Sequence, residues 1–463
     1  MPYAVVEQAK VLERQIIEIW QHQLLDGTKL TTEGGEPIKI IYPGRINDDR
    51  GPDFRDAVID TNGELIKGDI EIHVKSSGWR AHRHHYDLAY NGVILHVVMW
   101  HDTKATTNLQ NGKSVPILAI HEYISPISQS PNLTYPTTTV TTPCREAIEH
   151  LSIGIVAKFL DTTGEERFLA KASQFQADLA QMEASQCLYQ GIMGALGYSK
   201  NKLPFLELAH RLPLQVLQSM AQSKISEAEY LAQKQALLLG TAGLLPSQRQ
   251  NWCPENKLDD KWIDQLERLW ASCHQPKAMS GDDWHLFKVR PNNFPTRRIA
   301  AMSYLILCYR ERGIFEEVVN MVKEVPLNRG YHQLEQGLVV TASGYWVSHF
   351  DFGLGGRINN PTLLGSRRAA DIVVNIILPF IFAWSKITSQ PELASKALSL
   401  YCSYPNLVAN TIERHMSKQL GLNSNLVNSA RRQQGLMHIY NTLCTQGRCH
   451  CCSLSQLKTG NRV

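Results

Sequence analysis

The sequence lacks a long hydrophobic run and carries little net charge. No stretch of 18 or more apolar residues occurs, because polar residues and Pro379 interrupt the most apolar segment, residues 369–384, so we expect no membrane span. The 47 Lys and Arg residues exceed the 43 Asp and Glu residues by only 4, which is too even a balance to indicate nucleic-acid binding by charge alone. Residues 1–20 contain no uninterrupted apolar segment of the secretory type, so we expect a cytoplasmic protein.

Disulfide bonds are not expected either, because the ten cysteines of a cytoplasmic protein should be free thiols or metal ligands.

The chain has 463 residues, of which 43% are hydrophobic and 19% charged. This composition excludes a disordered or collagen-like chain and is typical of a globular protein with a sizeable core. At about 100–200 residues per domain, the length predicts two or three domains.

The periodicity of the hydrophobic residues changes near residue 145. An amphipathic helix over residues 11–25 precedes strand-like segments at 38–42, 54–60, 65–74, 92–100 and 115–121. Ser, Pro and Thr are frequent over 125–143, and most of the remainder has helical periodicity. We therefore predict an α+β fold with four parts: a small mixed-sheet domain over 1–125, a linker over 126–145, a large all-α domain over 146–440 and a cysteine-rich metal-binding tail over 441–463.

Two carboxylates are expected to meet in the predicted sheet domain. Asp53 begins one strand, Asn62-Gly63 has the composition of a hairpin turn, and Glu71 lies on the returning strand. The polar residues that alternate onto one face of the returning strand are Asp69, Glu71, His73 and Lys75. A half-exposed strand would show the same pattern. Two convergent carboxylates would also suit Mg²⁺ or Mn²⁺, which activates water and neutralises charge on a phosphate.

This arrangement resembles the PD-(D/E)XK nuclease pattern, in which Pro-Asp on one strand is followed on the next by an acidic residue, any residue and Lys. Pro52-Asp53 matches the first part, and Glu71-Ile72-His73 matches the second with His73 at the usual position of Lys. The resemblance implies that the domain over 1–125 is nuclease-like and that Asp53 and Glu71 bind the metal. It also implies that His73 or Lys75 positions or activates water.

Nucleases of this superfamily often carry a further acidic residue on the helix before the sheet. Glu13 and Glu18 of the first predicted helix are the candidates. A histidine-rich segment after the second strand offers another chemistry, because His73, His82, His84 and Asp87 together are adequate ligands for Zn²⁺. His82 and His84 are alternatively solvated loop residues or contacts to nucleic acid.

A cluster of cysteines lies near the end of the sequence. Cys444, Cys449 and Cys452 have the local spacing of plant-type ferredoxins, whose fourth cysteine is distant, and Cys144 is a candidate for that ligand. Zinc is equally compatible with these thiolates, with His450 or Cys451 as the fourth ligand. The combination resembles certain helicase-associated and CRISPR-associated exonucleases, which join a PD-(D/E)XK core to a cysteine-held iron–sulfur cluster.

A basic segment is a candidate for contacts to a phosphate backbone. Arg290, Arg297 and Arg298 lie near Trp284 and Phe294, and cationic side chains beside aromatic ones suit nucleic acid. Pairing of Arg290 with a carboxylate between helices is the commoner alternative.

Almost the whole chain resembles a bacterial family of unassigned function, domain-of-unknown-function family 2851. The motifs that carry this resemblance are Glu13–Trp20, Gly51–Phe54, Gly68–Val74, Trp79, His82, Asp87, Tyr90-Asn91, Leu95–Val98, Arg290–Pro295 with Arg297 or Arg298, and the cysteine tail. The site chemistry predicts a divalent-metal-dependent nuclease acting on DNA or RNA. The alternatives are a non-catalytic nucleic-acid-binding or assembly protein with an inactive nuclease-like core, and a zinc-dependent hydrolase. No oligomeric state follows from the sequence.

Overall fold

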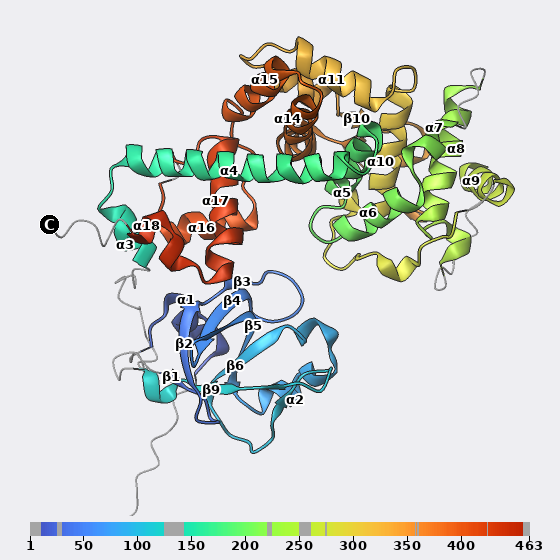
Figure 1. The fold of residues 1–463 in the computed structure, drawn as a ribbon. Coiled ribbons are helices and arrows are strands. Elements are labelled where there is room, and N and C mark those ends of the chain that lie inside the picture. The colour runs from blue at the N-terminus through green and yellow to red at the C-terminus, as the bar shows by residue number, and fades with distance from the viewer. Residues whose placement is uncertain are drawn as a thin grey trace, which may run out of the picture. The chain divides into compact units, whose positions relative to one another are not determined.

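The computed structural model of the protein (Figure 1) describes residues 11–25, 30–124, 143–219, 225–249, 261–273, 276–356, 358, 361–423 and 425–456. The chain divides into two compact units. Unit 1 consists of Met1–Thr163, Ala409–Leu426 and Leu436–Val463, and unit 2 of Gly164–Val408 and Val427–Gly435. Most of the predicted linker lies outside the described residues, and its last residues, 143–145, begin helix α3 (Pro143–Glu149).

Unit 1 contains the predicted mixed sheet, and the predicted α+β class is confirmed. Its strands are β1 (Leu30–Thr31), β2 (Pro37–Tyr42), β3 (Arg45–Ile46), β4 (Phe54–Thr61), β5 (Glu64–Lys75), β6 (Val93–Trp100) and β9 (Ile117–Ala119). The strand order is β1-β2-β4-β5-β6-β9, with β3 paired to β4. The pairs from β1 to β5 are antiparallel, whereas β6 runs parallel to both β5 and β9. A separate small hairpin joins β7 (Thr107–Asn108) and β8 (Ser114–Val115).

The turn between β4 and β5 follows from its two residues. Asn62 and Gly63 have φ angles of 55° and 88°, the left-handed conformation that a two-residue hairpin requires. Asp60 Oδ1 accepts a hydrogen bond from the Gly63 amide at 2.7 Å, which stabilises the turn. The turn therefore fixes the register that brings the start of β4 opposite the end of β5.

Helix α1 (Glu13–His22) contributes to the core of the sheet. Its buried side chains Ile16, Ile19 and Trp20 belong to one hydrophobic cluster with Phe54 of β4 and side chains of β5 and β6. The parallel strands β5 and β6 need a crossover connection, which is supplied by α2 (Gly78–Ala81) and the 3-10 turns η1 (His84–Tyr86) and η2 (Leu88–Tyr90). This crossover contains the predicted histidines.

Segments from the end of the chain complete unit 1. These are α16 (Thr411–Leu420), the later part of α17 (Ala430–Thr442), the turns η10 (Cys444–Gln446) and η11 (Cys449–Cys451), and α18 (Ser453–Gln456). The Tyr440 hydroxyl donates to Asp56 Oδ2 at 2.5 Å, and the Tyr42 hydroxyl lies 2.7 Å from His415 Nε2. The helices therefore do not all belong to one domain over 146–440, because 146–163, 409–426 and 436–440 join the sheet.

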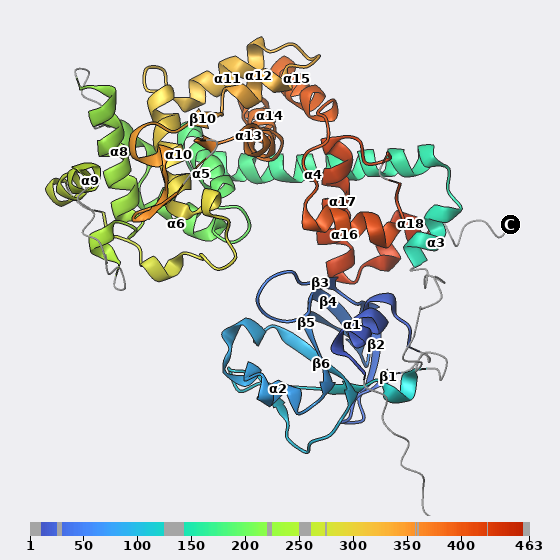
Figure 2. The same cartoon turned by 180° about the vertical axis from the view of Figure 1, so that it is seen from behind.

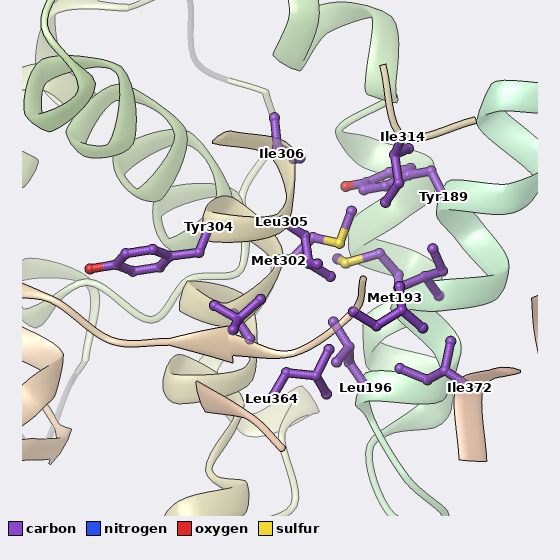
Figure 3. Packing of buried hydrophobic residues seen from close by; sticks show 14 of the residues in the cluster. Tyr189, Met193, Leu196, Met302, Tyr304, Leu305, Ile306, Ile314, Leu364 and Ile372 are labelled. Atoms are coloured by element: carbon purple, nitrogen blue, oxygen red, sulfur yellow. The ribbon is translucent and has the colours of Figure 1, made fainter. Parts of the chain in front are cut away.

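Unit 2 is helical, as predicted. Its helices are the later part of α4 (Ile153–Leu179), α5 (Ala184–Leu196), α6 (Lys202–Arg211), α7 (Leu214–Ser219), α8 (Glu227–Thr241), α9 (Lys261–Ser272), α10 (Pro295–Cys308), α11 (Ile314–Glu324), α12 (Tyr331–Gln336), α13 (Ser366–Ile372), α14 (Leu378–Ile387) and α15 (Pro391–Cys402). Two small two-stranded antiparallel sheets pair β10 (Val340–Thr341) with β13 (Thr362–Leu364) and β11 (His349–Asp351) with β12 (Leu354–Gly355). Figure 3 shows Met193 of α5 and Met302 of α10 pointing toward each other in the core.

One helical segment of unit 2 is long and apolar enough to cross a membrane. It covers Ser366–Ile387 and consists of α13, a π-helical turn over Val373–Ile377, and α14. More than half of its most apolar window is buried within the protein, as in a core helix. The cytoplasmic location stays a prediction.

Candidate metal and nucleic-acid site

Strands β4 and β5 bring Asp53 and Glu71 together. The Asp53 amide donates a hydrogen bond to Glu71 Oε2 at 3.1 Å, and the Ile72 amide donates to Asp53 Oδ2 at 2.9 Å. Each carboxylate is thus held by the backbone of the opposite strand. Glu71 is buried, with 5% of its surface exposed.

The carboxylates repel one another in a poorly solvated environment. Burial is the main cause that raises the pKa of Asp53 to about 7; the neighbouring Glu71 and Glu13 act in the same direction, and the Ile72 amide opposes them. Burial likewise raises the pKa of Glu71 to about 8, with Glu13 again acting in the same direction. Glu13, at the start of α1, therefore lies within electrostatic range of both carboxylates, whereas Glu18 pairs with Arg14 at 3.2 Å. A divalent cation would relieve this repulsion.

Three histidines lie together, and two of them meet Glu71. The nitrogen atoms of His73, His82 and His84 available for metal binding all lie within 4.8 Å of one another. His84 Nε2 is 3.1 Å from Glu71 Oε1, and His73 Nε2 is 3.7 Å from the same oxygen. His84 Nε2 is buried and forms no hydrogen bond with any described residue. A buried imidazole nitrogen this close to a carboxylate oxygen suits either an ion pair or two ligands of one cation.

A chain of hydrogen bonds orients His73. Its Nδ1 is 2.9 Å from His96 Nε2, and His96 Nδ1 is 3.0 Å from Thr107 Oγ1. Burial is the main cause that lowers the pKa of His73 to about 2 and that of His96 to about 3, so both rings are neutral. If each ring donates from Nδ1 along this chain, His73 Nε2 keeps its lone pair toward the carboxylates.

Aromatic side chains that the sequence did not assign to the site form its walls. Trp79 is buried and donates from Nε1 to the Asn108 carbonyl at 3.0 Å, and its ring lies against His84 and His96. Tyr90 stacks on His84 with 3.8 Å between ring centroids. The sequence signal that could have assigned them to the site is their position on the crossover, where Trp79 lies between His73 and His82 and Tyr90 follows His85.

Exposed cationic and aromatic side chains occupy the same crossover. Arg80 and Arg83 are exposed, and Tyr86 has 75% of its surface exposed. Among the described residues, Lys75 makes no hydrogen bond or ion pair with Asp53 or Glu71 and points to solvent from the end of β5. The structure therefore does not bring Lys75 to the carboxylates. The exposed arginines of the crossover, Arg80 and Arg83, lie on either side of His82 in the sequence.

The other predicted contacts to nucleic acid are only partly on the surface. His84 is buried against Glu71, whereas His82 is exposed and its Nδ1 is 3.0 Å from His73 Nε2. Arg290 is exposed and stays a candidate for phosphate contacts.

The predicted phosphate contacts of Arg297 and Arg298 are corrected by their burial. Arg297 has no exposed surface, and its Nη1 donates to the Trp346 and His349 carbonyls at 2.8 and 2.7 Å. Arg298 donates to the Leu363 carbonyl and to Asn293 Oδ1. The two guanidinium groups bind backbone and side-chain oxygens in the core of unit 2, where a phosphate does not reach them.

The predicted cysteine ligands lie elsewhere in unit 1. Burial raises the pKa of the Cys444 thiol well above its ordinary value, and Cys144, Cys449 and Cys452 raise it further, so these three thiols lie within its electrostatic range. None of the described cysteines forms a disulfide.

The comparisons with known proteins give a family without an assigned activity. The model of the family described as "Protein of unknown function (DUF2851)" matches residues 13–407, a range that includes Glu13, both carboxylates of the sheet and the histidines. No curated protein and no solved structure matches the chain.

Proposed function

The chain belongs to the DUF2851 family, and from the chemistry of its carboxylate–histidine site we propose that it is a divalent-metal-dependent nuclease. The observation that carries the proposal is the meeting of Glu71, which accepts a hydrogen bond from the Asp53 amide, with the buried His84 Nε2, to which no described residue forms a hydrogen bond. Carboxylate oxygens and imidazole nitrogens fixed at this separation are suited to hold one metal ion.

The proposed reaction is hydrolysis of a phosphodiester bond. Asp53, Glu71 and His84 would hold the metal, and Glu13 would add negative charge beside it. A metal bound there would supply a water of lowered pKa as the nucleophile and would neutralise charge on the leaving oxygen. Because burial disfavours a proton on His73, we assign that ring as a further ligand rather than as the base that accepts the proton from water.

The surface beside the site supports a nucleic-acid substrate. Arg80, Arg83 and Tyr86 alternate with the site histidines along one short crossover, and all three are exposed. Guanidinium groups bind phosphates, and an exposed tyrosine ring offers a surface on which a base stacks. The placement of Glu13 near the carboxylate pair also agrees with the acidic helix residue that the PD-(D/E)XK resemblance implied.

The histidines favour a second candidate, a zinc-dependent hydrolase with another substrate. Three imidazoles beside two carboxylates bind Mn²⁺ or Zn²⁺ in preference to Mg²⁺, because nitrogen ligands are softer than oxygen ligands. Both candidates use the same metal ligands, so the substrate distinguishes them.

The test is cleavage of single- and double-stranded DNA and RNA by the full chain with Mg²⁺, Mn²⁺ or Zn²⁺. We expect fragments with Mn²⁺ and none in the presence of a chelator. Cleavage of simple esters or phosphoesters, but of no nucleic acid, would support the second candidate. A chain that binds Mn²⁺ yet cleaves neither class of substrate would contradict both and leave a non-catalytic nucleic-acid-binding or assembly role.

His84→Ala should weaken Mn²⁺ binding by about 10–100-fold, because even residues that only support a ligand cost this much when removed. Calorimetric titration with Mn²⁺ measures the change. His85→Ala is the matched control, since this neighbouring ring packs against Tyr86 at a tilt of 42° and is not part of the histidine cluster. Equal Mn²⁺ affinity of the two variants would exclude His84 as a ligand.

Replacing both Arg80 and Arg83 with Gln should weaken nucleic-acid binding and reduce its salt dependence. The plot of log affinity against log salt has a negative slope, and each lost phosphate contact makes it shallower by roughly 1. The slope of the double variant should therefore be shallower by up to about 2. Binding of a labelled oligonucleotide at several salt concentrations gives the slope. Arg312→Gln, at an arginine of unit 2 whose side chain is 70% exposed, is the control, and an unchanged slope in the double variant would refute the contact.

A further inference from the structure

Cysteines from two distant parts of the sequence meet in unit 1. Cys144 lies in the first turn of α3, while Cys444 begins η10, Cys449 begins η11 and Cys452 directly precedes α18. Helix α18 packs against α3, and Figures 1 and 2 show the two helices side by side from opposite directions. The fold thus brings Cys144 to cysteines that follow it by roughly 300 residues.

The backbone of the C-terminal segment forms two tight turns between its thiols. Gly447 has a φ of 66°, and its amide donates to the Cys444 carbonyl at 3.1 Å. A Cβ atom at Gly447 would lie 3.0 Å from Val58 Cγ1, so this turn packs closely on the sheet. The Cys452 amide donates to the Cys449 carbonyl at 3.1 Å, which closes the second turn. Such turns keep ligands with short spacing on one side of the chain.

Four of the cysteines in these segments form one cluster. The packing of α18 on α3 brings Cys452 to Cys144, and the two turns place Cys444 and Cys449 on the same segment as Cys452. In agreement with this, the pKa of Cys444 is raised by burial and by Cys144, Cys449 and Cys452. Cys451 is exposed. The cluster is therefore the set to which a metal would bind, with Cys144 in the place of the fourth ligand.

We propose that Cys144, Cys444, Cys449 and Cys452 form a tetrathiolate metal site that ties α3 to the C-terminal segment. Four thiolates suit Zn²⁺ or an iron–sulfur cluster, both of which this ligand set binds. The site shares no residue with the carboxylate–histidine site, so it does not depend on the proposed nuclease activity.

The site has a structural consequence. The chain leaves unit 1 within α4, returns at Ala409 for α16, and returns again within α17 after Val427–Gly435 of unit 2. A metal held by α3 and the C-terminal segment would close the loop of roughly 300 residues between them. Its binding energy would add to the folding energy of unit 1. An ordinary apolar core explains the cysteines less well, because Cys449 is exposed at the surface of the cluster.

Metal analysis of the full chain purified without oxygen tests the proposal. We expect about one zinc per chain, or iron and sulfide with visible absorbance that bleaches on reduction. Cys144→Ser and Cys449→Ser should each lose this metal. Cys451→Ser is the matched control and should keep it, as should Asp53→Asn, which separates this site from the carboxylate–histidine site.

If the serine variants fail to fold, alkylation of the wild-type chain gives an independent answer. The metal should protect the four ligand thiols, but not Cys451, from a thiol reagent, and a chelator should remove that protection. Metal-free protein whose four thiols react as fast as Cys451 would overturn the proposal. Metal retained in Cys144→Ser but lost in Cys451→Ser would overturn the assignment of the fourth ligand.

Discussion

Asp53→Asn should lower metal-dependent cleavage by about 10²–10⁴-fold, the range expected when one member of a catalytic set is removed. The amide removes a negative charge from the metal but leaves an oxygen that accepts the hydrogen bond from the Ile72 amide. The fold and the affinity for nucleic acid should therefore survive. Cleavage rates with Mn²⁺ and binding of the same oligonucleotide measure the two properties separately.

The same variant should be at least as stable as the wild type without metal. Burial raises the pKa of Asp53 from its ordinary value of 3.8 to about 7, so the ionised carboxylate destabilises the folded state increasingly as the pH rises from about 4 to 7. Asn is neutral at every pH and avoids this cost. Thermal unfolding in a chelator should show the advantage growing over that range, and Mn²⁺ should then stabilise only the wild type. Asp60→Asn, on the same strand, is the control, and wild-type cleavage by Asp53→Asn would exclude a metal ligand there.

Arg297→Ala should destabilise unit 2 by about 3–5 kcal/mol, because it leaves a cavity and two carbonyl groups without their donor. The carbonyls are those of Trp346 and His349, on the segment that leads into β11. Denaturant unfolding followed by intrinsic fluorescence measures the loss. The salt dependence of nucleic-acid binding should not change for folded protein.

Arg290→Ala provides the contrast, since this arginine is exposed. It should change stability by no more than about 0.5 kcal/mol, as is usual for surface substitutions. If Arg297→Ala kept the wild-type midpoint but lost nucleic-acid affinity, the structural role of Arg297 would be wrong.

The hairpin that builds the site was predictable because its signals are local. Asn62-Gly63 sets the turn, and alternation along β5 places Glu71 and His73 on one face. Alternation does not predict the β-bulge in β4. Phe54 pairs with Ile70 and Ala57 with Gly68, so β4 has one residue more than β5 between these pairs, and Asp56 takes a φ of 62°. An extra residue in a strand changes which side chains face the core without leaving a distinct composition.

Burial of the arginines was not predictable from their surroundings in the sequence. The backbone carbonyls that bind Arg297 and Arg298 lie about 50–65 residues later, and any residue type supplies a carbonyl. The choice among the histidines was open for a similar reason. The crossover folds back over β5, and only its path determines that His84 rather than His85 meets Glu71.

The return of the chain to unit 1 has a consequence for its synthesis. The sheet is complete once residue 119 has left the ribosome, but the helices and turns that pack on it near Tyr42, Asp56 and Val58 follow roughly 300 residues later. At about 5–20 residues per second, the newly made sheet waits about 15–60 s for them. During that interval unit 2 is being translated, and a chain released early would present the sheet without its C-terminal helices to chaperones and proteases.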